Sequence, residues 1–305
     1  MKKYKVAIIT RTKNRKILLR RAIESILGQT FEDWCMVIVN DGGVKGDVED
    51  LVWDYSDKFR GRCYIIHNEI SKGMEAASNS GIKASSSDYI VIHDDDDSWH
   101  PQFLEKCVNF LDHNPYPSFR GVITYSVRIL ERIENDKIII ESKEPFNRWM
   151  KSVSLFRMAA NNVFPPISFV YRRDVIDEIG YYREDLPVLG DWEFNLRFMS
   201  KYDIYLIPEE LAYYHHRLSI KSGDYTNSVI GHDDKHIFYD TLIRNELLRR
   251  DLERNELGLG YLVNLGNSFE SLHSQIFPIE RFITRLKSIN WLKRTAKKFL
   301  WKNDR

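Results

Sequence analysis

Short apolar runs alternate with amphipathic segments through the first hundred residues. Four apolar runs rich in β-branched residues predict buried strands: 5–10, 34–40, 62–67 and 89–93. Three segments with apolar residues at helical spacing lie between them: 18–27, 48–59 and 73–84. Gly28 follows the first of these segments, as a helix C-cap residue does. Strands that alternate with helices at this spacing predict βαβ units and a parallel sheet.

The pattern changes in the second part of the chain. Alternating positions predict a hairpin with strands 121–130 and 137–141 and a turn at 134–136. Three further strands are expected at 167–171, 203–207 and 211–215, and Pro208 is expected to break the chain between the last two. From about residue 237 the spacing is helical, and the tail 279–305 is amphipathic and basic. The prediction is a mixed α/β sheet flanked by helices over 1–220, followed by a helical C-terminal extension over 221–305.

Composition narrows the possible partners and the location. Lys and Arg together number 45 against 44 for Asp and Glu, so no overall positive field favours nucleic acid. Cys35 and Cys107 lie in apolar patterns and are expected to be reduced core residues, which indicates the cytoplasm. The N-terminus runs directly into a predicted strand, so no signal peptide is expected, and no apolar run is long enough to cross a bilayer.

Four consecutive aspartates, Asp94–Asp97, follow the strand predicted at 89–93. Carboxylates this close repel one another unless a counter-charge is present, and oxygen ligands suit Mg²⁺ or Mn²⁺ bridged to phosphates. Two alternatives stay open. The first is that Asp97 or Ser98 merely caps the next helix and binds no metal. The second is a calcium loop with Asp94, Asp96, Ser98 and Glu105 as ligands, although Trp99 replaces the glycine that such a loop needs.

Thr10, Asp41 and the four aspartates all follow predicted parallel strands. The carboxyl ends of parallel strands meet at one edge of a sheet, and ligands of such sheets bind outside that edge. The sequence therefore predicts a binding site there, with a metal and a diphosphate as its ligands.

An ordered set of motifs carries a family resemblance over about two-thirds of the chain. Its members are Ile8–Arg15, Ser25–Phe31, Val39–Gly43, Asn68, Gly73, Ala76, Ala77, Asn79, the acidic stretch up to Pro101, and Gly190–Phe194. With these motifs the chain resembles inverting, family 2 type glycosyltransferases, which have the GT-A fold with a Rossmann-like mixed sheet. The resemblance implies a nucleotide-binding half at about 1–115 and an acceptor half at about 116–220.

The resemblance also implies roles for single residues. Thr10, Asn14 and Asp41 would line the nucleotide-base pocket, and Asp94 or Asp95 would face the ribose. Asp96 would be the leading metal ligand, with Asp94 and His216 as further ligands of Mn²⁺ or Mg²⁺. Ser78 stands where the family often has arginine, so phosphate contacts would fall to the metal, Arg11 or Lys72, and Arg217 beside His216 is a further candidate for the diphosphate site.

Asp191 lies near the start of a helix whose apolar stripe includes Trp192 and Leu196. An aspartate there can simply be an N-cap. In the family, the corresponding acidic residue is the general base that takes the proton of the acceptor hydroxyl. Asp191 is preferred over Glu193, which would point elsewhere on the helix.

The resulting expectation is a metal-dependent inverting glycosyltransferase that moves a sugar from a nucleoside diphosphate sugar to a hydroxyl. The expected acceptor is a glycan or lipid-linked glycan of surface polysaccharide or glycolipid synthesis. The basic tail could dock on the inner face of the membrane or pack on protein. Two other classes stay open: a non-catalytic sugar-nucleotide-binding or scaffold protein, and a sugar nucleotidyltransferase, for which a glycine-rich loop after the first strand is lacking. Phe146, Trp149, Phe156 and Phe164 could form a sugar platform or belong to the core.

Overall fold

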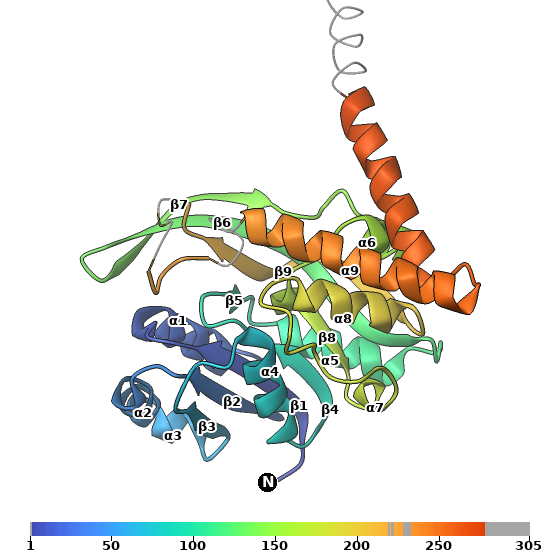
Figure 1. The fold of residues 1–305 in the computed structure, drawn as a ribbon. Coiled ribbons are helices and arrows are strands. Elements are labelled where there is room, and N and C mark those ends of the chain that lie inside the picture. The colour runs from blue at the N-terminus through green and yellow to red at the C-terminus, as the bar shows by residue number, and fades with distance from the viewer. Residues whose placement is uncertain (1, 219, 221–222, 228–232, 278–305) are drawn as a thin grey trace, which may run out of the picture.

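The computed structural model describes residues 2–218, 220, 223–227 and 233–277. These residues form a nine-stranded mixed sheet in the order β3–β2–β1–β4–β8–β6–β9–β5, with β7 paired to β6 (Figure 1). The strands of the first half are β1 (Tyr4–Thr12), β2 (Trp34–Asp41), β3 (Cys63–Asn68) and β4 (Ser87–Ile92). They pair in parallel, as the sequence pattern predicted.

Helices cover both faces of this parallel half. They are α1 (Lys16–Leu27), α2 (Lys45–Asp54), α3 (Ser56–Phe59), α4 (Met74–Lys83) and α5 (Phe103–His113). Ile8 packs with residues of α1 on one face, while Ile9 packs with residues of α4 on the other. All eight residues of β2 are buried because side chains on both faces meet helices. The single helix predicted over 48–59 is instead divided at Tyr55 into α2 and α3.

The second half of the sheet is mixed. It contains β6 (Phe119–Glu134), β7 (Lys137–Pro145), β8 (Phe169–Arg172), β9 (Asp203–His216) and the short β5 (Ser98–Trp99). Its helices are α6 (Leu155–Ala160), the 3-10 helix η1 (Pro166–Ser168), α7 (Val175–Ile179) and α8 (Gly190–Met199). The predicted hairpin is confirmed: β6 and β7 pair antiparallel around Asn135 and Asp136, both of which have positive φ.

The expected break at Pro208 is wrong, because β9 runs through it without interruption. Ile207 lies opposite Thr124 and Glu210 lies opposite Tyr125, so an irregularity in the pairing with β6 accommodates the proline. Proline lacks the N–H that a regular ladder needs, and a β-bulge is one of the places where a strand tolerates it.

Two capping interpretations are also wrong. The N-cap of α5 is Gln102, so Asp97 and Ser98 do not cap it. The N-cap of α8 is Leu189, with φ of +63°, and Asp191 lies inside the first turn. The calcium-loop alternative fails as well, because Ser98 belongs to β5 and its Oγ lies 2.8 Å from His215 Nε2.

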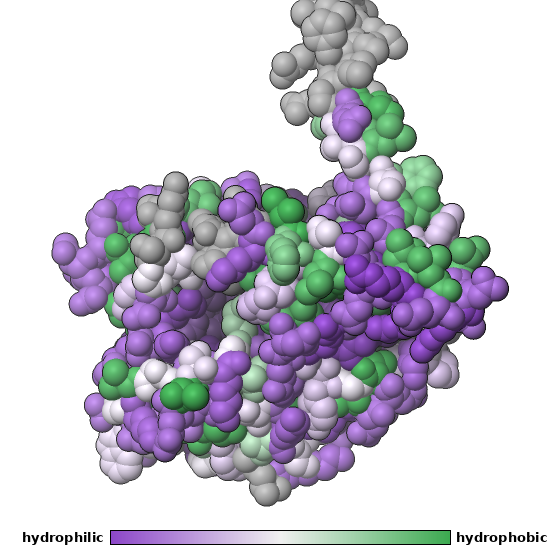
Figure 2. Space-filling model, in the orientation of Figure 1, coloured by the Kyte–Doolittle hydropathy of each residue, from purple (hydrophilic) through white to green (hydrophobic). Residues whose placement is uncertain are grey.

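The C-terminal extension is helical, as predicted, through α9 (Asp233–Arg254) and a following helix at 259–277. The basic tail 279–305 lies outside the described residues. Within the described part of the chain, no helix is long and apolar enough to cross a membrane. Figure 2 shows apolar side chains on the C-terminal helices. Leu252, Leu257, Phe269 and Leu272 of this part of the chain are exposed.

Candidate active site

A cleft of about 640 Å³ opens at the carboxyl ends of β1, β2 and β4 and extends to the start of α8. Seven of the ten residues proposed from the sequence line it: Arg11, Asp41, Asp94, Asp95, Asp96, Asp191 and His216. Residues far apart in the chain thus meet at the edge where ligands of parallel sheets bind.

Thr10, Asn14 and Lys72 are not among the residues that line this cleft. Thr10 is fully buried, and its hydroxyl has no hydrogen-bond partner among the described residues. Asn14 accepts a hydrogen bond from the Val44 N–H at 3.0 Å. The Lys72 N–H donates to both carboxylate oxygens of Asp41, at 2.9 and 3.0 Å. Thr10 is thus a core residue, the exposed Asn14 bonds the residue before α2, and Lys72 contacts Asp41 through its backbone N–H.

The Asp41 carboxylate organises the segment between β3 and α4. Besides Lys72, it accepts hydrogen bonds from the Asn68 side chain at 2.8 Å, the Ser71 hydroxyl at 2.7 Å and the Gly73 N–H at 3.0 Å. Burial alone would raise the pKa of Asp41, but these donors outweigh burial and lower it. Asp41 thus stays ionised and fixes the approach to α4 beside the cleft.

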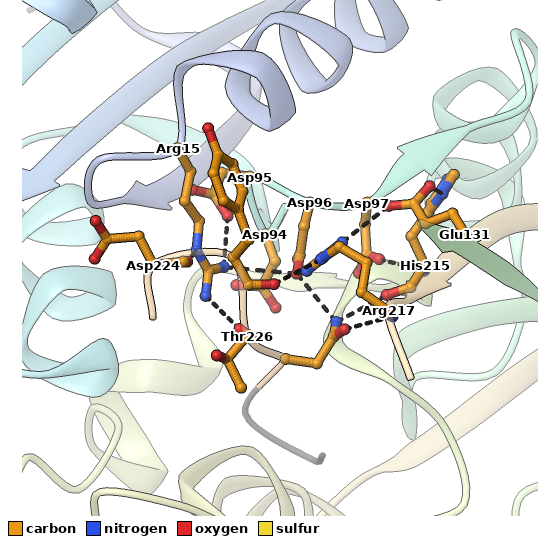
Figure 3. A network of polar contacts seen from close by, with 12 residues as sticks. Arg15, Asp94, Asp95, Asp96, Asp97, Glu131, His215, Arg217, Asp224 and Thr226 are labelled. Atoms are coloured by element: carbon orange, nitrogen blue, oxygen red, sulfur yellow. Dashed lines mark hydrogen bonds and ion pairs between the residues drawn. The ribbon is translucent and has the colours of Figure 1, made fainter. Parts of the chain in front are cut away.

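Each of the first two aspartates in the acidic stretch has its own counter-charge, from Arg11 at the end of β1 and from Arg15 just after it; Figure 3 shows Arg15 beside Asp95. Arg11 Nε donates to Asp94 Oδ1 at 2.9 Å. Arg15 Nη1 lies 3.1 Å from Asp95 Oδ1, and the Thr12 hydroxyl donates to Asp95 Oδ2 at 2.7 Å. The sequence showed that four adjacent carboxylates need positive charge, and the structure shows that arginines of this same chain supply much of it.

Asp96 pairs with Arg217, which lies far from it in the sequence, just after β9. Arg217, which is fully buried, forms an ion pair with Asp96 Oδ2, and the Asn227 amide donates to the same oxygen at 3.2 Å. Burial would raise the pKa of Asp96, but Arg217 and Arg15 more than offset it and hold the pKa at about 2. Asp96 is therefore ionised at neutral pH.

Glu131 near the end of β6 completes this buried network, and sequence reasoning missed it. It accepts hydrogen bonds from Arg21 and from Arg217 Nη1, the latter at 2.9 Å, and its Oε2 lies 2.7 Å from His215 Nδ1. Burial opposes its charge, but the His215 and Arg21 contacts lower the pKa of Glu131 to about 2. No local motif marks Glu131, because its partners come from α1 and from the end of β9.

A segment after β9 closes against the acidic stretch. Arg15 Nη2 donates to the Thr226 carbonyl at 2.6 Å, and the Arg217 N–H donates to Asn227 Oδ1 at 2.7 Å. The Asn227 side-chain amide donates a hydrogen bond to the His215 carbonyl at 2.9 Å. Gly223, Asp224 and Asn227 also line the cleft. This segment therefore forms a wall of the cleft over Asp95 and Asp96, as Figure 3 shows.

The described residues contain no preassembled cluster of three or more metal-ligating side chains. Asp94 and Asp96 nevertheless line the cleft with His216, whose buried Nε2 has no hydrogen-bond partner among the described residues. Burial, with repulsion from Arg128, lowers the pKa of His216 to about 4, so its imidazole is neutral at pH 7 and keeps a lone pair. Carboxylates beside a neutral imidazole fit a divalent cation that draws its remaining ligands from a bound diphosphate.

Asp191 in the first turn of α8 and Glu75 in the first turn of α4 both line the cleft. Asp191 Oδ2 accepts a hydrogen bond from Asn162 Nδ2 at 2.7 Å, and Oδ1 accepts one from the Trp192 N–H at 2.8 Å. Burial raises the pKa of Asp191. Glu75 in α4 is buried 3.8 Å from Arg11 Nη1, and burial, with repulsion from Asp191 and Asp94, raises its pKa to about 8.

The four aromatic residues proposed as a sugar platform separate in the structure. Phe164 is a core residue that packs on Phe169, with ring centres 5.2 Å apart. Phe146 lines the cleft, while Trp149 is 51% exposed and lines a neighbouring cavity. Phe156 packs on Phe269 of the C-terminal helix. Phe146 and Phe164 therefore border the cleft that contains Asp191, and Trp149 borders the neighbouring cavity.

Comparisons with known proteins agree with this architecture. The family model described as glycosyl transferase family 2 matches residues 7–180. The uncharacterized glycosyltransferase YwdF of Bacillus subtilis is 29% identical over 217 residues, which cover 67% of this chain and 71% of YwdF. The chain therefore belongs to glycosyl transferase family 2.

Solved structures show the same fold. Residues 1–349 of S. aureus TarS in complex with UDP-GlcNAc match with a TM-score of 0.58 and 18% identity, over 80% of this chain and 66% of that one. The mannosyltransferase PcManGT of Pyrobaculum calidifontis, in complex with GDP-Man and Mn²⁺, matches with a TM-score of 0.55 and 16% identity. The match covers 73% of this chain and 59% of PcManGT. The chain thus has the GT-A fold, and it spans about two-thirds or less of these neighbours.

Proposed function

We propose that this protein is a metal-dependent, inverting glycosyltransferase that moves a sugar from a nucleoside diphosphate sugar to a hydroxyl acceptor. The observation that carries the proposal is the placement of Asp191 in one cleft with Asp94, Asp96 and Arg11. Inversion requires a base on one side of the anomeric carbon and the departing diphosphate on the other. The cleft holds the Asp191 carboxylate together with Arg11 and Arg15, which can pair with a diphosphate.

The donor would be held at the nucleotide edge. Asp41 and the segment it organises would border the base, and Asp95 would face the ribose. Arg11 and Arg15 line the cleft at 11% and 24% side-chain exposure, so both can turn part of their charge toward a diphosphate. This supplies phosphate contacts that do not depend on Ser78, whose hydroxyl donates to the Met74 carbonyl at 3.1 Å.

Asp96 and His216, with Asp94, would hold Mn²⁺ or Mg²⁺. When bound, such a cation stabilises negative charge on the departing diphosphate as a Lewis acid. The neutral His216 imidazole and the ionised Asp96 carboxylate are already in the protonation states that metal ligands need at pH 7.

Asp191 would take the proton of the acceptor hydroxyl. The hydroxyl oxygen forms a bond to the anomeric carbon, the bond from that carbon to the diphosphate oxygen breaks, and the proton passes to Asp191. The raised pKa of Asp191 favours this transfer, because a stronger base accepts the proton more readily. The Asn162 hydrogen bond holds the carboxylate in place while it acts.

We infer further that the acceptor is a glycan or lipid-linked glycan of surface polysaccharide or glycolipid synthesis. A cytoplasmic location, with the basic tail 279–305 docked on the inner face of the membrane, stays a prediction. A liposome pull-down with and without residues 279–305 tests it, and equal pelleting of the two proteins would contradict it.

Thermal unfolding with UDP, GDP, CDP and dTDP, each with and without Mn²⁺, tests the donor site. A ligand at 100 times its dissociation constant adds about 2.7 kcal/mol to the free energy of unfolding, which is visible as a melting shift. We expect a metal-dependent shift with one nucleotide, lost in Asp96→Ala and kept in Asp57→Ala, which removes an exposed aspartate of α3. No shift with any nucleotide would refute the proposal.

A further inference from the structure

A second cavity, of about 430 Å³, adjoins the active-site cleft. Phe146 and Asn162 line both spaces, so the two are neighbours at these side chains. The other aromatic and polar residues of its lining are Trp149, Arg157, Asn161 and Glu270. None of these residues belongs to the nucleotide edge, and Glu270 comes from the helix at 259–277, beyond the part of the chain that matches the family model.

The C-terminal helix is fixed in place as one wall of this second cavity. A Cβ atom on Gly266 would lie 3.1 Å from the Ala160 N and 3.2 Å from the Phe156 O, so the helix backbone packs closely on α6. Arg244 of α9 donates to the Ala160 carbonyl at 2.7 Å and also to the Val263 carbonyl. This buried guanidinium ties α6, α9 and the C-terminal helix together, and Glu270 is therefore held beside α6.

The lining combines an aromatic face with polar side chains. The Trp149 ring is half exposed, and the Arg157 guanidinium lies 4.9 Å from its centre. Asn161 and Glu270 are exposed around it. A sugar ring has apolar C–H faces that pack on an aromatic ring and hydroxyls at its edge that pair with amide, guanidinium and carboxylate groups. An acyl chain would leave these polar groups unpaired at a cost, so the lining favours a carbohydrate.

The cavity is also joined to the proposed base. Asn162 lines it and donates to Asp191 Oδ2 at 2.7 Å. A ligand in the cavity that reaches past Asn162 and Phe146 therefore enters the cleft beside Asp191.

From this placement we propose that the second cavity is the acceptor subsite, and that it takes a glycan with one sugar ring stacked on Trp149. The C-terminal extension then has a direct part in acceptor selection, because it supplies the Glu270 wall. This inference rests on the proposed glycosyltransferase function and adds to it the place where the glycan acceptor binds and the residues that contact it.

The test uses the full chain, with Trp149→Ala as the variant and Trp53→Ala as the matched control. Trp53 is 78% exposed on α2, so both substitutions remove an exposed indole. The probes are an array of bacterial surface oligosaccharides, read in the presence of the nucleotide that gives the melting shift, and the kinetics of transfer to the glycan that binds best. We expect Trp149→Ala to raise the KM for that glycan at least tenfold and to leave the KM for the donor unchanged.

Glu270→Gln provides a second variant on the other wall, with an expected severalfold rise in the same KM. Hydrolysis of the nucleotide sugar without acceptor is measured in parallel. Normal hydrolysis with equal glycan affinity in the wild type and Trp149→Ala would overturn the acceptor subsite, as would wild-type protein that binds no glycan of the array. Loss of nucleotide binding and hydrolysis in the wild type would instead refute the proposed function itself.

Discussion

Glu75→Gln is expected to stabilise the protein, and the gain should grow as the pH rises from 5 to 8. The Glu75 carboxyl is buried between Arg11 and the start of α8, where a Cβ on Gly190 would lie 2.5 Å from its Cδ. Burial, offset in part by Arg11 and reinforced by Asp191 and Asp94, raises the pKa of Glu75 from 4.5 to about 8. The folded protein therefore binds a proton that the unfolded chain releases.

The sign and size follow from linkage. Below pH 4.5 the Glu75 carboxyl is protonated in both the folded and the unfolded state and does not lower the free energy of unfolding. Between pH 4.5 and 8 the unfolded chain ionises first, so the free energy of unfolding of the wild type falls as the pH rises. At 1.36 kcal/mol per pKa unit, the loss is under about 1 kcal/mol at pH 5, about 3 kcal/mol at pH 7 and about 4 kcal/mol at pH 8. Glutamine has the same shape and no charge to lose, so the variant escapes this loss.

The assay is urea unfolding of both proteins at pH 5, 7 and 8. The difference in the free energy of unfolding isolates Glu75, because the other titrating groups are common to both proteins. Glu32→Gln, at an exposed glutamate, serves as the control and should show a small difference that does not depend on pH. A Glu75→Gln difference that is constant across this range, or that shrinks as the pH rises, would refute the burial argument.

Three further outcomes are expected. Asp191→Asn should lower kcat by about 10² to 10⁴, as loss of a general base does, and should leave nucleotide affinity unchanged in calorimetry; an active variant would remove Asp191 from the mechanism. Arg217→Met should lower the free energy of unfolding by about 3 to 5 kcal/mol, because Asp96 and Glu131 would lose a buried counter-charge; a loss near zero in urea unfolding would contradict the network. Thr10→Val should keep or raise the melting temperature, because the hydroxyl is buried without a partner; a clear drop would reveal a hydrogen bond there.

The sequence by itself determined the parallel half of the sheet and its functional edge. Buried parallel strands read as continuous apolar runs, and helices between them show their own spacing, so local patterns were enough. The position of Asp41 and of Asp94–Asp96 at strand ends then placed them at one edge without any knowledge of packing. The need of the acidic stretch for positive charge was also readable, because like charges repel wherever the chain folds.

Only the tertiary structure decided which residues supply positive charge to the acidic stretch. Arg217 reaches both Asp96 and Glu131 because β6 and β9 pair along their length, and no local pattern predicts a pairing between distant strands. The same holds for Glu75, whose raised pKa depends on burial against α8, and for Glu270, which reaches the second cavity because Gly266 lets the C-terminal helix approach α6. Burial and long-range contact set these properties, and both arise only when the whole chain has packed.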